Sequence, residues 1–337
     1  MTARSWENRS RILICLAVLA LALAPTTARA QRAPLAYISN EHAGTISVID
    51  TGRDRVVATI PIGEGRPRGL QLSPDGRTLY VAVSDEAPLL ETDNDAIVVI
   101  DVATRKVTAR LPGGTDPEQF AVSPDGTRLY VANEDAGLAS IIDLTDRSVV
   151  ATLVVGVEPE GVAVSPDGRW VYVTAETSNT VSVIDTEVDR VVANFLVDVR
   201  PRAATFAPDG TRAYVTAEIG GTVSVVDVAT HTVTDEVVLA GGEAKPVGVV
   251  VAPDGSRVYV ANGHADSVSG IDTKTNEVVM NVPVGKRPWG IGITPDGKKL
   301  YTANGVSHDV SVIDVASGKV VKTIQAGRGA WGVAVGP

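Results

Sequence analysis

A short turn sequence, Ser-Pro-Asp-Gly or a close variant, recurs six times along the chain and constrains the fold more than any other feature. Proline presets the backbone of a β-turn, aspartate accepts backbone N–H groups within it, and glycine supplies the freedom to leave it. The flanking residues are apolar and β-prone, as in 120–122 and 129–131. Each copy therefore predicts an antiparallel hairpin. The six prolines are Pro74, Pro124, Pro166, Pro208, Pro253 and Pro295.

Two further marks repeat with the same period of about 42 residues. A tyrosine opens the strand that follows the turn position, and an apolar–apolar–aspartate ending closes a later strand. Each repeat then holds four short strands, A to D in chain order, which is typical of a propeller blade. The tyrosines are Tyr37, Tyr80, Tyr130, Tyr172, Tyr214, Tyr259 and Tyr301. The aspartates are Asp50, Asp101, Asp143, Asp185, Asp227, Asp272 and Asp314.

The repeats number seven by these marks but only six by their turns, and the two chain ends explain the difference. Residues 37–40 copy the strand after a turn, and residues 331–335 copy the strand before one. The two segments complete one blade if they pair, which closes the ring and leaves no open sheet edge. The sequence predicts an all-β, seven-bladed β-propeller with four-stranded antiparallel blades. A solenoid, the alternative, would instead need a polar cap at each end.

The first 30 residues have the composition of a cleavable export signal. Three arginines precede a 13-residue apolar run at 12–24, and Ala28-Arg29-Ala30 forms a small-x-small cleavage site. The run is too short to span a bilayer, which needs about 20 residues. We expect a signal peptide at 1–30 and a periplasmic propeller at 31–337, with no membrane span in the mature chain.

Composition excludes several classes of function. The single cysteine, Cys15, lies in the signal segment, so the mature chain has no disulfide, thiolate metal site or cysteine nucleophile. Loss of four basic residues and one acidic residue with that segment changes the formal charge from −10 to −13. This charge disfavours nucleic acid and anionic membrane as partners and permits basic proteins. GxSxG, HExxH and phosphate-loop motifs are also missing from the sequence.

Strand alternation divides the connections between two faces. The D–A and B–C connections share one face, here called the top face, and the Pro-Asp-Gly turns share the other, the bottom face. Residues present in every blade are architectural, so the seven aspartates should cap turns and the seven tyrosines should pack. A binding site must therefore break the sevenfold pattern.

The residue after the proline that enters strand A, or its equivalent, breaks this pattern most. Around the ring it is Arg68, Glu118, Glu160, Arg202, Val247, Trp289 and Trp331. The preceding residues are Arg66, Asp116, Glu158, Arg200, Lys245 and Arg287. This mixture predicts a ligand or partner site on the top face, in which Arg68, Glu118, Glu160 and Arg202 orient a polar group and Trp289 and Trp331 supply apolar area. The alternative is mutual ion pairing, with the tryptophans plugging the channel.

The B–C loops add further candidates. Three neighbouring blades carry acidic residues in these loops, namely Glu134, Asp135, Glu176 and Glu218. His42, His264 and His308 fall in three blades that are consecutive once the ring closes, and they predict a metal site unless they are simply solvated. The long acidic loop 84–96 is expected to be solvated or, as a second interpretation, to contact a partner through Leu89 and Leu90. Glu118 and Glu160 are also candidates for paired acid–base chemistry.

The Tyr-Val-Ala-Asn and Tyr-Val-Thr-Ala strands and the Ser-Pro-Asp-Gly turns resemble the YVTN β-propeller repeat family over residues 35–337. DPEQFAVSPDG (116–126) and AEIGGTVSVVD (217–227) further resemble the β-propeller proteins associated with catabolism dependent on pyrroloquinoline quinone (PQQ). That resemblance implies an exported accessory protein in PQQ-dependent alcohol oxidation. It implies a periplasmic quinoprotein dehydrogenase or a cytochrome c as partner.

The first functional hypothesis is therefore a non-enzymatic periplasmic protein that binds a small molecule or a protein on its top face. The alternatives are a lactonase-type hydrolase, which uses a divalent metal held by top-face carboxylates, and a pure interaction scaffold. Seven-bladed lactonases share the architecture, and fold alone does not choose among these functions.

Overall fold

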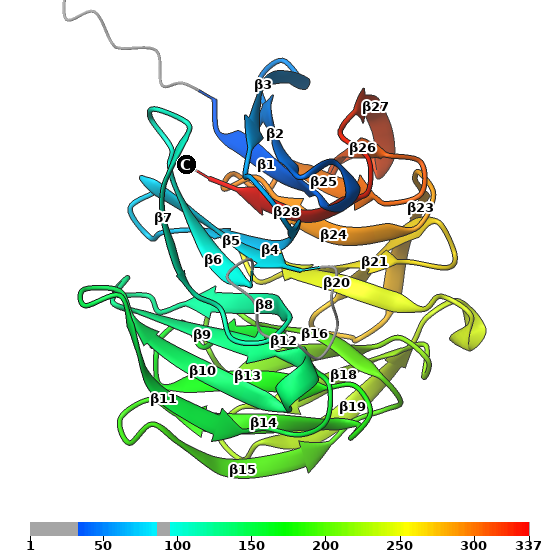
Figure 1. Ribbon diagram of the computed structural model, residues 1–337. Helices are drawn as coiled ribbons and strands as arrows, with labels where there is room; N and C mark the ends of the chain where they lie inside the picture. The colour runs from blue at the N-terminus through cyan, green and yellow to red at the C-terminus, as the bar shows by residue number, and fades with distance from the viewer. Residues whose placement is uncertain (1–32, 86–94, 337) are drawn as a thin grey trace, which may run out of the picture. The chain divides into compact units, whose positions relative to one another are not determined.

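The computed structural model describes residues 33–85 and 95–336 of the chain (Figure 1). Residues 33–337 form one compact unit. Its described part consists of four-stranded antiparallel sheets, with three short 3-10 turns, η1 (Glu41–Ala43), η2 (Glu134–Ala136) and η3 (Ala240–Gly242). The predicted signal peptide and the Leu89–Leu90 contact lie outside the described residues.

Seven sheets follow one another around the ring. Blade 1 has β28 (Ala330–Val335), β1 (Leu35–Asn40), β2 (Thr45–Asp50) and β3 (Arg55–Pro61). Blade 2 has β4 (Arg66–Leu72), β5 (Thr78–Ser84), β6 (Ala96–Asp101) and β7 (Lys106–Pro112). Blade 3 has β8 (Pro117–Val122), β9 (Arg128–Asn133), β10 (Leu138–Asp143) and β11 (Ser148–Val154). Blade 4 has β12 (Pro159–Val164), β13 (Trp170–Ala175), β14 (Thr180–Asp185) and β15 (Arg190–Leu196).

The other three blades repeat this arrangement. Blade 5 has β16 (Pro201–Phe206), β17 (Arg212–Ala217), β18 (Thr222–Asp227) and β19 (Thr232–Val238). Blade 6 has β20 (Pro246–Val251), β21 (Arg257–Asn262), β22 (Ser267–Asp272) and β23 (Val278–Pro283). Blade 7 has β24 (Pro288–Ile293), β25 (Lys299–Asn304), β26 (Asp309–Asp314) and β27 (Lys319–Gln325). The predicted all-β, seven-bladed propeller is confirmed.

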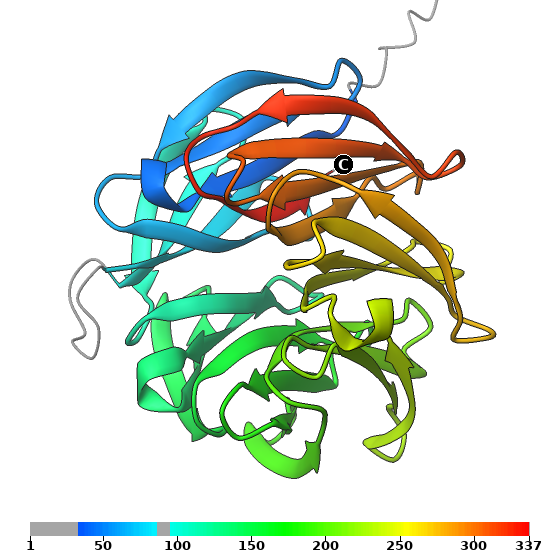
Figure 2. The same ribbon diagram turned by 90° about the vertical axis from the view of Figure 1, so that its right-hand side faces the viewer.

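The ring closes through its chain ends. Strand β28 pairs antiparallel with β1, and Tyr37 lies opposite Ala334 in the register. Figure 1 shows red β28 beside blue β1, and Figure 2 shows the blue and red strands together in a second view. The innermost strands contact their neighbours in order around the axis, and β28 contacts β4. The chain therefore completes blade 1 from both ends, as its repeats predict.

The repeated residues have the architectural roles that their repetition predicts. Every tyrosine at the start of strand B is at most 8 % exposed and packs between sheets. The aspartate that ends strand C accepts backbone hydrogen bonds in the following turn, as Asp50 Oδ1 does from the N–H groups of Gly52 and Arg53 at 2.9 and 3.0 Å. Hydrogen bonds from the turn hold the pKa of such carboxyls, Asp143 among them, below the usual value.

Within the described ranges, no helix is long and apolar enough to cross a bilayer.

Candidate functional site

The same backbone conformation precedes strand A in most blades and places the candidate residues on the top face. In blades 3 to 7, the residue before the strand-A proline has a left-handed backbone, with φ between 43° and 62°. Non-glycine residues rarely adopt this conformation, and the proline then directs the chain into an extended strand. Because the conformation recurs in five blades, the strain belongs to the architecture. The five residues are Asp116, Glu158, Arg200, Lys245 and Arg287.

Glycines in strand A set the spacing between neighbouring blades. A Cβ atom added to Gly161 would lie 2.4 Å from the carbonyl oxygen of Arg202, and one added to Gly332 would lie 2.7 Å from that of Arg68. Real Cβ atoms do not approach so closely, so these glycines let the inner strands pack tightly beside the candidate residues. Glycine recurs two residues after the strand-A proline, or after Ala330 in blade 1, which is a signal in the sequence for these close approaches.

The six predicted site residues surround one mouth of the central channel. Arg68 forms an ion pair with Glu118, and Arg202 Nη2 lies 2.9 Å from Glu160 Oε1. The Arg202 guanidinium lies 5.3 Å from the centroid of the Trp289 ring. Trp289 stacks on Trp331, with 6.3 Å between ring centroids and 18° between planes. Val247, which completes the ring of equivalent positions, is buried.

Over blades 4 and 5, the charges form a closed network. The Arg202 side chain is only 8 % exposed and contacts Glu176 as well as Glu160. Arg200 Nε lies 2.7 Å from Glu176 Oε2 and 3.3 Å from Glu218 Oε2. Buried charges are expensive unless each is paired, and here each has a partner. This half of the mouth shows the mutual ion pairing that was the alternative to a ligand site.

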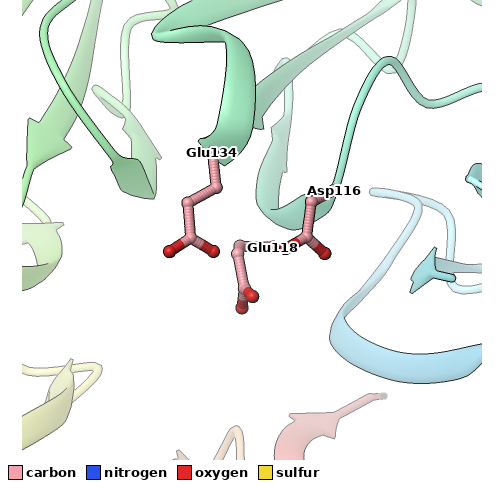
Figure 3. Close-up of side chains that lie close together, drawn as sticks. All are labelled: Asp116, Glu118 and Glu134. Carbon is pink, nitrogen blue, oxygen red and sulfur yellow. The ribbon is translucent and has the colours of Figure 1, made fainter. Parts of the chain in front are cut away.

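Over blade 3, three carboxylates converge instead (Figure 3). Asp116 precedes β8, Glu118 lies on β8, and Glu134 begins η2. One oxygen from each lies within 4.8 Å of the others. Glu118 is fully buried, and no residue in the described part of the chain donates a well-aligned hydrogen bond to either of its oxygens. We call Asp116, Glu118 and Glu134 the carboxylate cluster.

The carboxylate cluster carries excess negative charge. Burial, followed by the charges of Glu160 and Asp116, raises the pKa of Glu134 to about 7. Arg66 and Arg68 partly offset the charge, but Glu41 shares both, at 3.3 and 3.5 Å. Four carboxylates thus face two guanidinium groups, which leaves two negative charges when all are ionised. The deficit equals the charge of one divalent cation.

Glu41 is not among the residues predicted from the sequence, although comparison of the repeats identifies it. The segments 40–44 (Asn-Glu-His-Ala-Gly) and 133–137 (Asn-Glu-Asp-Ala-Gly) are copies of one loop, so Glu41 occupies in blade 1 the position of Glu134 in blade 3. Both loops form a 3-10 turn that ends at a left-handed glycine. The glutamate thereby points from the B–C loop toward the neighbouring blade.

The histidines are not gathered in one metal site. In residues 33–85 and 95–336, the group of three potential ligands that the structure forms is the carboxylate cluster, which has no histidine. His42 and His308 both approach Gly329, whose N–H donates to His308 Nδ1 at 3.1 Å. His264 lies on the B–C loop of blade 6. On the bottom face, His231 Nδ1 hydrogen bonds with the Tyr172 hydroxyl at 2.8 Å.

Comparisons with known proteins agree with the architecture. The family model described as "Lactonase, 7-bladed beta-propeller" matches residues 190–335, and the model of the cytochrome D1 heme domain matches residues 83–198. The chain is a seven-bladed propeller, and parts of it are similar to the lactonase and cytochrome D1 families. Neither model covers half of it, no curated protein matches it, and the narrower likeness to PQQ-associated propellers stays a prediction.

Several solved structures share the fold. A hydrazine synthase structure from Kuenenia stuttgartiensis is 23 % identical, with a TM-score of 0.74, and the match covers 83 % of this chain and 92 % of that one. A putative 6-phosphogluconolactonase from Bacteroides uniformis is 18 % identical, with a TM-score of 0.76 and coverage of 91 % and 100 %. A second, from Bacteroides fragilis, is 18 % identical, with a TM-score of 0.74 and coverage of 93 % and 100 %. At these identities, the likeness shows the fold alone.

Proposed function

We propose that the top face hydrolyses a cyclic ester, a lactone, with a divalent cation held by Asp116, Glu118 and Glu134. The observation that carries the proposal is the convergence of three carboxylates beside too few positive charges. The match to the lactonase family model and the two neighbours titled as putative 6-phosphogluconolactonases favour this class of reaction. The lactonase match begins at residue 190, so the cation site in blade 3 rests on geometry alone.

The donor set suits a hard cation. Carboxylate oxygens are preferred by calcium, magnesium and manganese, and calcium takes them at about 2.3–2.6 Å. Two oxygens on opposite sides of one calcium ion are then about 5 Å apart, and the oxygens of the carboxylate cluster, which lie within 4.8 Å of one another, fit that span. Calcium is therefore the cation used in the test below.

The chain's residues would contribute binding, charge and proton balance. In lactone hydrolysis a water oxygen bonds to the carbonyl carbon, the ring C–O bond breaks, and a proton moves from the water to the departing oxygen. When bound, the cation would supply Lewis acidity to the carbonyl and the water. Arg68 places positive charge beside Glu118, where it can stabilise negative charge that develops on the carbonyl oxygen. Glu134 must lose its proton for the site to be complete, so activity should rise with pH through about 7.

The test is a direct measurement of cation binding and turnover. The purified protein is treated with a chelator, titrated with calcium by calorimetry, and assayed against aliphatic and aromatic lactones in a pH-stat. We expect binding of one calcium ion per chain and calcium-dependent ring opening. Asp116→Asn should lose both. Glu158→Gln is the matched control, because Glu158 is exposed and holds the equivalent position in blade 4. Failure to bind calcium and to open any lactone would refute the proposal.

A second candidate is the accessory binding protein of PQQ-dependent alcohol oxidation, which the resemblance of segments 116–126 and 217–227 favours. The acidic chain would attract basic proteins such as a cytochrome c. This candidate includes export to the periplasm by the segment 1–30. Affinity capture from the periplasm of cells grown on an alcohol should recover a quinoprotein dehydrogenase or a cytochrome c. Recovery of neither would count against it.

A further inference from the structure

A second hollow on the top face lies beside the stacked tryptophans. It has a volume of about 220 Å³ and is lined by Glu41, His42, Arg287, Trp289, Val306 and Trp331, together with backbone. We call it the aromatic pocket. For comparison, an apolar cavity of about 150 Å³ is large enough for benzene. The aromatic pocket therefore has room for a small ring with a substituent.

The walls of the aromatic pocket suit a flat ring. Trp289 and Trp331 lie nearly parallel, and Trp331 is anchored in β28 with only 6 % of its surface exposed. A Cβ atom on Gly305 would lie 2.7 Å from Trp289 Cδ1, so the backbone at this position packs directly against the indole edge. Rigid aromatic walls bind planar ligands with little loss of conformational freedom.

One edge of the pocket carries an accessible positive charge. The Arg287 guanidinium lies 4.6 Å from the centroid of the Trp289 ring, and its side chain is 42 % exposed. Its ion pair within the described residues is with Glu218, at 3.8 Å, close to the outer limit for such a contact. Arg202, on the same ring, is instead 8 % exposed and tightly paired. Arg287 is thus the arginine able to accept a new anionic partner. Its planar guanidinium can donate two parallel hydrogen bonds to a carboxylate.

The aromatic pocket adjoins the carboxylate cluster through two residues. Glu41 lines the pocket and lies 3.5 Å from Arg68 Nε, and Arg68 forms the ion pair with Glu118. A single molecule that entered the mouth could therefore place one end against the tryptophans and the other beside the carboxylates.

We propose that the aromatic pocket binds a flat aromatic ring bearing a carboxylate, with the ring against Trp289 and Trp331 and the carboxylate on Arg287. The binding follows from the pocket itself. Its consequence for catalysis rests on the proposed function and names the substrate class as aromatic lactones that carry a carboxylate. Such a substrate would be chosen over an aliphatic lactone of the same ring size.

The test uses 2-naphthoate as the probe, with calorimetry and tryptophan fluorescence in the presence of a chelator. We expect saturable binding, and at least about tenfold weaker binding of 2-naphthol, which lacks the carboxylate, and of cyclohexanecarboxylate, which lacks the aromatic ring. Arg287→Gln should weaken 2-naphthoate binding by about tenfold. Trp289→Leu should weaken it by a similar factor. Arg169→Gln is the matched control, because Arg169 lies 5.0 Å over Trp170 in the same kind of contact on the bottom face.

The outcomes separate the pocket from the proposed hydrolysis. Binding of 2-naphthoate that depends on Arg287, without lactone turnover, supports the pocket and refutes the hydrolase. Lactone turnover without 2-naphthoate binding supports the hydrolase and refutes binding at the aromatic pocket. The proposal for the aromatic pocket is refuted if all three probes bind equally well. It is also refuted if Arg287→Gln binds 2-naphthoate unchanged while thermal melting shows an intact fold.

Discussion

Blades 3 and 4 carry nearly the same acidic residues on the top face, yet their surroundings differ. Blade 3 presents Asp116, Glu118 and Glu134, while the equivalent positions of blade 4 are Glu158, Glu160 and Glu176. Glu160 and Glu176 of blade 4 and Glu134 of blade 3 face the next blade around the ring, whereas Glu118 of blade 3 pairs with Arg68 of the preceding blade. Blade 4 meets the arginines of blade 5 and forms a closed network, whereas blade 3 meets the acids of blade 4 and keeps excess negative charge.

The comparison shows that the neighbouring blade decides what an acidic group on this ring becomes. A carboxylate opposite an arginine becomes a buried ion pair, which stabilises the ring. A carboxylate opposite other carboxylates, as Glu134 is, acquires a raised pKa, and we propose that a bound cation offsets the excess charge there. The four predictions below test this contrast, from the largest expected effect to the smallest.

Arg202→Met should destabilise the propeller most. It leaves Glu160 and Glu176 buried without their shared partner, and breaking a buried pair in this way costs about 3–5 kcal/mol of unfolding free energy. Urea denaturation monitored by circular dichroism measures the loss. A loss below about 1 kcal/mol would show that Arg202 is not what stabilises these acids.

Glu118→Gln should strongly weaken calcium binding while retaining the fold. The substitution keeps the shape of a fully buried side chain but removes the charge that a cation requires. We expect calcium affinity to fall by about 100-fold, which corresponds to about 2.7 kcal/mol. Calorimetry measures the affinity, and Glu158→Gln should leave it within about twofold because that carboxylate lies outside the cluster. Equal losses in both variants would contradict the assignment.

Glu134→Gln should increase stability above neutral pH. The pKa of Glu134 is about 7 in the folded protein and near 4.5 in the unfolded chain. Between these pH values the folded protein therefore retains a proton that the unfolded chain releases. The stability contributed by this proton is fully present below pH 4.5 and is lost as pH rises through 7.

Glutamine removes this dependence on pH. With a discount for partial exposure, the Glu134→Gln variant should be about 1–2 kcal/mol more stable than the parent at about pH 8 and equal to it at about pH 4. Thermal melts at both pH values measure the difference in calcium-free buffer. A variant less stable than the parent at the higher pH would contradict the raised pKa of Glu134.

Glu158→Arg should convert the surroundings of blade 3 into those of blade 4. Arg200 holds this position in blade 5 and reaches back to Glu176 at 2.7 Å, so an arginine at 158 should reach Glu134 in the same way. The pair is partly exposed, so the gain is about 0.5–1 kcal/mol. The pKa of Glu134 should fall and calcium affinity should drop several-fold, as measured by calorimetry across pH. Glu158→Gln separates loss of the acid from gain of the base.

The fold could be predicted from the sequence because each blade corresponds to one copy of a repeated sequence segment. Turn, tyrosine and aspartate recur with one period, and complementary ends such as 37–40 and 331–335 can meet only if the ring closes. Each local signal agrees with the global topology, which is why the strands followed from patterns alone.

The site was predicted less completely. Internal comparison found the unequal residues of the top face, but it treated Glu118 and Glu160 as equivalent acids and grouped three histidines by blade number. The carboxylate cluster instead joins Glu118 to Glu134 from the following loop, and the charge balance involves Glu41 from another blade. Side-chain reach and burial set these contacts, and neither appears in repeat spacing.

The sequence alone determined how many blades form, which residues cap their turns, and which positions face the mouth of the channel, because these follow from local turn chemistry and strand alternation. Only the tertiary structure decided which charges meet across neighbouring blades, which side chains lose their water, and where the tryptophans leave a hollow. Those outcomes depend on distances between atoms that lie far apart in the chain, and the balance between desolvation and pairing changes within a few ångströms.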